Sequence, residues 1–220
     1  MNILKSPTDI WSEYYKGRSY NAGIGLYDRV SLNENFYLGK QWEGLNAPEL
    51  EKPVLNFLKR AVNYYISMLV SDDVSAVVEP FIEPDGGSIV TEIMSCEIDR
   101  VIERTKAKSL HRDMLRNAAV DGDGCFYLRF DPDISTGQTA KGEIVIENID
   151  NTKILFGNPY VNDVQIQPYL LLIKREMLQS VKERARLNGC KDWDSIISDN
   201  TDMYGNEQYG SNEMCTVVTK

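Results

Sequence analysis

The chain has 220 residues and a mass of 25.0 kDa, enough for one large domain or two small ones. Its formal net charge is −9. This charge excludes a broad surface of clustered Lys and Arg that would hold DNA tightly by neutralising its phosphates. A channel through which DNA slides stays compatible with an acidic chain, because a basic wall would retain the phosphates.

The cysteines and the histidine give little support for a metal site. His111 is the single histidine, and no CxxC pair is present; the four cysteines are Cys96, Cys125, Cys190 and Cys215. This spacing argues against structural zinc. The polar N-terminus lacks the pattern of a secretory signal, so we expect free thiols in a reducing cytosol. Polar residues interrupt the most apolar stretch, residues 54–70, so it is not predicted to span a membrane.

The first fifty residues predict two helices and a loop. Residues 6–9, Ser-Pro-Thr-Asp, are typical of a helix start, and the short helix that follows should end at Gly17. Residues 21–25 should form a flexible joint. Apolar spacing predicts a second helix over residues 26–40, and residues 43–52 should form a loop.

An amphipathic helix is predicted from residue 53 to residue 70. Lys59, Arg60 and Asn63 should face outward, and the inward, buried positions recur at spacings of three and four: Leu55, Leu58, Val62, Tyr65 and Leu69. A short strand is predicted over residues 74–81, and residues 84–87 should form a turn.

The longest predicted helix begins at Ser88, kinks near residues 105–108 and ends at Gly122 and Gly124. Its apolar face is defined by Ile89, Ile93, Cys96 and Val101. We expect it to pack on the helix from residue 53 through Leu55, Leu58, Val62, Ile93 and Val101. Residues 125–131 and 143–149 are predicted as two strands that flank a turn, which makes a hairpin with a long polar tip.

The last third predicts short strands, one helix and a polar loop. Strands are expected over residues 151–157 and 168–175, and a helix over residues 175–188 with Gly189 as its C-cap. Residues 198–212 are Gly- and Asn-rich without periodicity and predict a loop or a disordered segment. A final strand over residues 214–220 has no obvious partner, so we expect the chain to be the front part of a longer protein.

These elements predict an α+β fold, with long amphipathic helices packed on a small, mostly antiparallel sheet. The expected organisation is one α+β domain over residues 1–190, a polar and flexible loop over residues 191–213, and the start of a strand over residues 214–220.

No catalytic pattern stands out, and the chain is not expected to be an enzyme or to hold a cofactor. The acidic turns at residues 121–124 and 131–133 do not match the ligand spacing of a calcium-binding EF-hand, so turn formation explains them better. His111 has no nucleophile pattern near it. The basic runs at residues 59–61 and 103–108 lie in amphipathic helices and indicate solvated faces. The twelve tyrosines suit cores and subunit interfaces equally.

Four segments in order resemble the portal proteins of tailed bacteriophages. The first is the sequence FYLGKQW followed by PVLN, carried by Phe36, Tyr37, Gly39, Gln41, Trp42, Pro53 and Asn56. The second, residues 74–80, is similar to a strand that ends in an acidic residue and Pro. The third, residues 118–131, resembles a helix, a Gly-rich turn and an aromatic strand. The fourth, residues 145–159 with the helix behind it, resembles an Asn-Pro turn before a strand and a helix.

The resemblance covers residues 10–190 and implies the N-terminal part of the portal wing, an outer α+β region of a ring. A portal ring, a dodecamer by resemblance, stands at one capsid vertex of the virion and conducts double-stranded DNA without sequence-specific binding. The implied partners are other copies of the chain, the terminase large subunit, and capsid and tail or adaptor proteins, with no membrane. Stem and clip segments have no counterpart here, so no DNA-facing residue is assigned.

Two other functions stay open from the sequence. A different head–tail structural or adaptor protein would share the acidity and the aromatic residues. A metal-dependent nuclease would use Asp121, Asp123 and Asp131, although the usual spacing of such a site is missing. For Trp42, an anchor between two helices and a partly exposed surface position are both compatible with its place after a helix.

Overall fold

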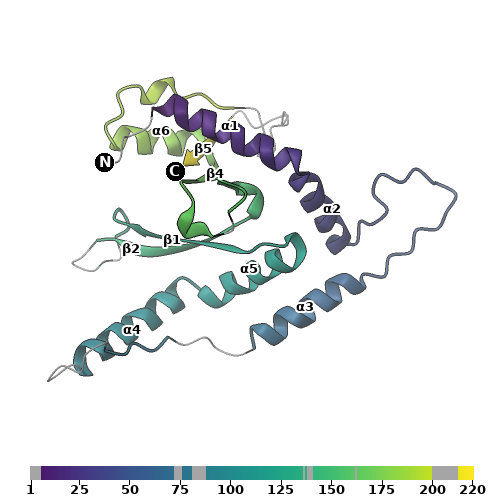
Figure 1. Cartoon of the computed structure of the whole chain (residues 1–220). Helices are drawn as coiled ribbons and strands as arrows, with labels where there is room; N and C mark the ends of the chain where they lie inside the picture. The colour runs from purple at the N-terminus through teal and green to yellow at the C-terminus, as the bar shows by residue number, and fades with distance from the viewer. Residues whose placement is uncertain are drawn as a thin grey trace. The chain divides into compact units, whose positions relative to one another are not determined.

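The computed structural model describes residues 6–71, 76–80, 88–135, 137, 141–161, 163–199 and 213–220 (Figure 1). Within these residues the fold is α+β, with six α-helices and two antiparallel sheets. Contacts divide the chain into two units, one formed by Met1–Arg29 with Thr152–Lys220 and the other by Val30–Asn151. The sequence predicts a single domain over residues 1–190, whereas this division places the N-terminal helix with the C-terminal third.

In the first unit, helix α1 (Pro7–Gly23) begins at a capping box in which Ser6 and Asp9 satisfy each other's backbone N–H groups. The prediction that this helix ends at Gly17 is wrong. A Cβ atom at Gly17 would lie 2.9 Å from the Cβ of Leu155, so this glycine lets α1 approach strand β3 closely. The core of the unit joins α1 to the sheet through Tyr14, Leu155, Leu171 and Ile173.

The sheet of this unit has the order β3 (Ile154–Phe156), β4 (Leu170–Met177) and β5 (Met214–Thr219). Both pairs are antiparallel, with Leu155 opposite Leu171 and Ile173 opposite Val218. The final strand therefore has a partner, strand β4, which sequence reasoning did not find. The predicted strand over residues 151–157 is shorter than expected because Asn151–Lys153 forms a 3-10 turn.

Helix α6 (Leu178–Leu187) follows β4 directly, so the helix predicted from residue 175 begins later. Arg175 belongs to the strand because its guanidinium pairs with Asp199 and donates to the Thr216 hydroxyl of β5 at 3.0 Å. Gly189 follows the helix with φ of +74°, the left-handed conformation expected just after a helix C-terminus.

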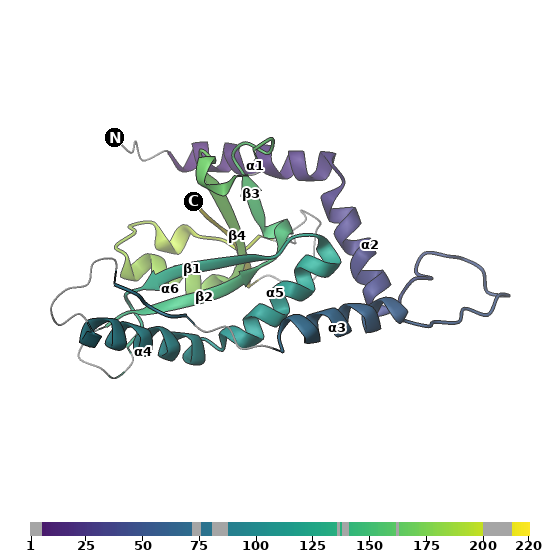
Figure 2. The same cartoon turned by 60° about the horizontal axis from the view of Figure 1, so that its bottom comes forward.

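The second unit is built around helix α5 (Ala107–Asp121), which contacts helix α3 (Phe57–Leu69), helix α4 (Ser88–Arg104) and strand β2. The remaining elements of this unit are α2 (Leu26–Leu38, which begins in the first unit), β1 (Cys125–Asp131) and β2 (Glu143–Ile149). Lys106 separates α4 from α5 with φ of +52°, at the position of the predicted kink. The β1–β2 hairpin runs beside α5 in both views (Figures 1 and 2).

Hairpin β1–β2 has the predicted boundaries, with Cys125 opposite Ile149 and Asp131 opposite Glu143. Across it, Arg129 pairs with Glu147 at 3.3 Å and, along its own strand, with Asp131 at 2.6 Å. The hairpin is a sheet of its own, separate from β3–β4–β5, so two small sheets replace the single predicted sheet.

The predicted helical core of this unit is wrong in its main contact. Leu55, Leu58 and Ile93 are exposed, as are Tyr65, Leu69 and Cys96. Helix α3 buries Ile66 and Val70 instead, because it packs on α5 through a different edge of its apolar surface. Amphipathic spacing locates the apolar side of a helix, but it does not show which part of that side the same chain covers.

Some predicted features lie outside the described residues, including the turn over residues 84–87 and most of the loop over residues 198–212. The strand predicted over residues 74–81 is described for residues 76–80, which form no strand.

Candidate functional site

The residues that carry the first motif meet where the chain leaves α2 and returns to α3. Gln41 Nε2 and Trp42 Nε1 both donate to the Pro53 carbonyl oxygen, at 3.4 and 3.1 Å. Asn56 Nδ2 donates to the Tyr37 carbonyl oxygen at 2.7 Å. These bonds close the base of the loop over residues 43–52, and we call Gln41, Trp42, Pro53 and Asn56 the loop base.

Asn56 has a second role, because its Oδ1 accepts from the Lys59 backbone N–H at 3.0 Å and caps the N-terminus of α3. Gly39 has φ of +83°, and a Cβ there would lie 3.1 Å from the Val54 side chain and 3.2 Å from Asn56 Nδ2. Glycine is therefore favoured at this position for two reasons, its left-handed backbone conformation and the limited space beside Val54 and Asn56.

Trp42 combines the two possibilities that its sequence position left open. Its indole N–H is fixed on the Pro53 carbonyl, so it anchors the loop, while 37% of the residue stays exposed. Phe36 contributes through its backbone, whose carbonyl accepts from Gly39 N–H at 3.1 Å, and its ring is exposed.

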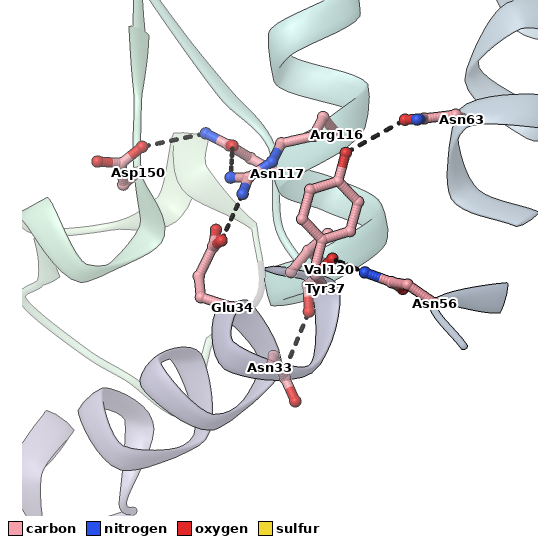
Figure 3. Close-up of polar contacts among 9 residues, drawn as sticks. All are labelled: Asn33, Glu34, Tyr37, Asn56, Asn63, Arg116, Asn117, Val120 and Asp150. Carbon is pink, nitrogen blue, oxygen red and sulfur yellow. Dashed lines mark hydrogen bonds and ion pairs between the residues drawn. The ribbon is translucent and has the colours of Figure 1, made fainter. Parts of the chain in front are cut away.

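Tyr37 links three helices of the second unit. Its hydroxyl donates to Asn63 Oδ1 of α3 at 3.2 Å, and its ring lies under the Arg116 guanidinium of α5, with 4.9 Å from Cζ to the ring centroid (Figure 3). Lys59 Nζ approaches the same ring at 5.6 Å. Two cations near one aromatic ring favour a fixed position of α2 between α3 and α5.

A polar network extends from this tyrosine along α5. Arg116 pairs with Glu34 of α2 and donates to Asn117 Oδ1 at 3.1 Å. The buried Asn117 amide donates to Asp150 Oδ1 at 3.0 Å, and Asn33 Nδ2 donates to the Val120 carbonyl oxygen at 3.0 Å (Figure 3). Hydrogen bonding at every step makes such a network a source of rigidity.

Asp121 lies at the end of this network and has an unusual carboxyl group. Burial raises the pKa of Asp121 to about 6, the carboxylates of Glu34 and Asp150 add to the rise, and Arg116 opposes it. Its Oδ1 is buried without a hydrogen-bond partner. A raised pKa with these causes marks a carboxyl group whose charged form is disfavoured by its surroundings.

The acidic turns considered for metal binding have structural roles. Asp131 pairs with Arg129, which lowers the pKa of Asp131, and its Oδ1 accepts from the Asp133 backbone N–H at 3.1 Å. Among the residues that the structure describes, no group of three His, Cys, Asp or Glu side chains is placed to hold a metal ion. None of the described helices has both the length and the apolar composition that a membrane crossing requires.

Sequence reasoning selected the loop base but missed the network around Arg116. Glu34 and Arg116 are far apart in the chain, and each is a common residue on an amphipathic helix, so no local pattern marks the pair. The conspicuous signal was the cluster of amide and aromatic residues from Asn33 to Trp42.

Comparison with protein-family models and with curated proteins gives no match to this chain.

Proposed function

We propose that the chain is a subunit of a bacteriophage portal, the ring at the unique capsid vertex through which double-stranded DNA is packaged and ejected. The observation that carries the proposal is the loop base. The motif residues from Phe36 to Asn56 that resemble the portal sequence are separated by a loop, yet Gln41, Trp42, Pro53 and Asn56 meet through hydrogen bonds. Motif residues that contact one another in the fold support a resemblance better than matching residues that share no structural role.

In this function the chain performs no reaction, and the ATPase of the packaging motor supplies the energy. Its partners are other copies of itself in a ring, twelve by resemblance, together with the terminase large subunit and capsid and tail or adaptor proteins. Its place is the virion, after assembly in the host cytoplasm. The net charge of −9 is compatible with a ring that conducts DNA without holding it.

The test is the assembly state of the protein at its full natural length, measured by mass photometry and negative-stain electron microscopy. We expect closed rings with a central channel, because a conduit for DNA requires rotational symmetry about the DNA axis. A natural-length protein that stays monomeric or dimeric over a wide concentration range would exclude the portal function.

A second measurement separates the portal from its alternatives. A portal ring is expected to retain the terminase large subunit in a pull-down, whereas a head–tail adaptor ring is expected to retain the portal but not the motor. DNA cleavage that depends on magnesium or manganese would favour the nuclease instead.

A further inference from the structure

Helix α3 is apolar around most of its circumference, but the chain buries only one edge of it. Val62, Ile66 and Val70 recur every fourth residue on that edge, with Ile66 6% exposed. At 100° per residue, one continuous arc beside this edge holds six exposed large side chains: Phe57, Leu58, Tyr64, Tyr65, Met68 and Leu69. We call these six residues the α3 face. A contiguous exposed apolar surface of this kind is typical of an interaction site.

The polar side of the same helix is already occupied within the chain. Lys59 Nζ approaches the Tyr37 ring, and Asn63 Oδ1 accepts from the Tyr37 hydroxyl. These contacts fix the rotation of α3 about its axis, so the helix cannot turn the α3 face toward its own α5. The exposure of the face is therefore a property of the folded unit.

The loop over residues 43–52 is the second exposed feature, and it extends away from the ends of α2 and α3 in both views (Figures 1 and 2). Leu45 and Leu50 are exposed on it. Glu43, Glu49 and Glu51 make it acidic, while Lys52 folds back to donate to the Leu45 carbonyl oxygen at 2.8 Å. The loop base holds this segment at the N-terminus of its own α3 and directs it off the helix.

The loop and the α3 face complement each other in apolarity and in charge. The loop offers two leucines and three carboxylates, and α3 offers an apolar arc bordered by one cation, Arg60, since Lys59 approaches the Tyr37 ring. Leu45 and Leu50 are exposed, so the loop does not cover the α3 face of its own chain. A loop from a second copy can do so, and this head-to-tail contact uses a different surface on each partner, as a closed ring requires.

We propose that residues 43–52 of one copy dock on the α3 face of a second copy. Leu45 and Leu50 pack on its apolar arc, and Glu49 and Glu51 lie near Arg60. This inference rests on the proposed function, since it names the surfaces through which ring subunits contact one another. A second copy suits the face better than an anionic membrane does, because a chain with a net charge of −9 is repelled by anionic lipid.

Two variants of the 220-residue chain each alter one side of the proposed contact. The face variant is Leu58→Gln with Leu69→Gln, and the loop variant is Leu50→Gln with Glu51→Lys. All four residues are exposed, so neither variant removes core packing. The matched control is Leu187→Gln, an exposed leucine (76%) at the end of α6.

Sedimentation velocity over a wide concentration range gives the result. Wild type and the Leu187→Gln control are expected to associate as concentration rises, and each variant alone should sediment as a monomer. An equimolar mixture of the two variants is expected to give a heterodimer and nothing larger, because the mixture keeps one intact loop–face pair and cannot extend it. A symmetric contact between two like surfaces would not give this pattern.

Several results would overturn the proposal: a wild-type chain that is monomeric at every concentration, variants that associate as wild type does, or a mixture that stays monomeric. Flotation with phosphatidylcholine–phosphatidylglycerol vesicles tests whether the α3 face binds a membrane. If the face variant loses vesicle binding and the loop variant keeps it, the α3 face would be assigned to lipid instead. Introduced into the natural-length protein, the two variants distinguish failure of the proposed contact from failure of the proposed function. Rings that form despite both sets of changes would refute this contact and leave the portal function standing, whereas a wild-type protein without rings would refute the function.

Discussion

At the scale of single residues, Asp121 predicts a dependence of stability on pH. Its pKa in the folded chain is about 6, above the ordinary value of 3.8, so between these values the folded state binds more protons than the unfolded state. The stabilising contribution of the protonated group is complete below pH 4 and is lost as pH rises toward 6. Replacing Asp121 by Asn should remove this loss, so the free energy of unfolding of the variant should gain on wild type from pH 4 to pH 6. Urea melts at several pH values measure the difference, and parallel curves would contradict the assignment.

Two glycines of α1 give opposite predictions for the same substitution. Gly17→Ala places a Cβ 2.9 Å from that of Leu155 and should destabilise the chain by roughly 1–3 kcal/mol through overpacking. Gly23→Ala meets nothing within 4 Å and should be neutral or stabilising by up to about 1 kcal/mol, because alanine favours the helix. Denaturant unfolding of both variants checks the signs. Equal effects would show that α1 does not approach β3 as closely as described.

Asn56 joins the loop base to the start of α3, so replacing its side chain should remove two stabilising interactions. Asn56→Ala loses the N-cap of α3 and the bond to the Tyr37 carbonyl, and we expect a loss of roughly 1–3 kcal/mol. Asn56→Ser keeps an N-cap oxygen and loses the donor, so it should cost less. Thermal and chemical unfolding compare the two, and an Asn56→Ala variant as stable as wild type would remove the structural role of this motif residue.

At the scale of elements, the structure predicts that a leucine of α3 can be truncated without cost and that a leucine of β4 cannot. Leu58 is 56% exposed, so Leu58→Ala should change the free energy of unfolding by less than about 0.5 kcal/mol. Leu171 of β4 is fully buried at 0% exposure, and Leu171→Ala should cost about 2–5 kcal/mol. Urea melts of monomeric protein measure both. A large loss at Leu58 would restore the sequence-based core that the structure replaces.

The elements also show where sequence reasoning succeeds. The glycines before β1 and the polar loop after it predict the boundaries of β1 and β2, because turn residues are local information. The end of α1 at Gly23 is missed because Gly17 has the composition of a stop signal and is retained for close packing on Leu155, a residue far along the chain. Helix α6 starts late because Arg175 is held in β4 by its contacts with Asp199 and Thr216. Each miss involves a long-range contact that propensity does not encode.

At the scale of the whole molecule, the charge balance predicts how the chain treats DNA. With a net charge of −9 and its basic residues distributed over amphipathic helices, we expect no measurable binding to random duplex DNA at physiological salt, and no cleavage with magnesium or manganese. Fluorescence anisotropy and a nicking assay on supercoiled plasmid test the two statements. Binding as tight as about micromolar at that salt would be incompatible with a conduit that lets DNA slide.

The candidate site was predictable only in part, because the sequence reveals contacts between residues that are close in the chain and not contacts between distant helices. The loop base draws on residues close enough in sequence to form a recognisable motif, so Gly39, Trp42 and Asn56 could be selected before their bonds were known. The pair Glu34 and Arg116 depends on α2 meeting α5, which only the folded unit reveals. Leu58, Tyr65 and Leu69 of the α3 face were predicted as core and are exposed, because the spacing of apolar residues does not distinguish a buried helix face from an exposed one.

The loop base also makes residues 43–52 a segment that should tolerate insertions. Its closing bonds are made by Gln41, Trp42, Pro53 and Asn56, outside the loop itself, so the two helix ends stay joined whatever sequence lies between them. Loop-closure entropy grows slowly with length, about 0.6 kcal/mol for each doubling. An epitope tag inserted after Asn46 should therefore leave the unit folded, and antibody binding to that tag would measure how accessible the loop is.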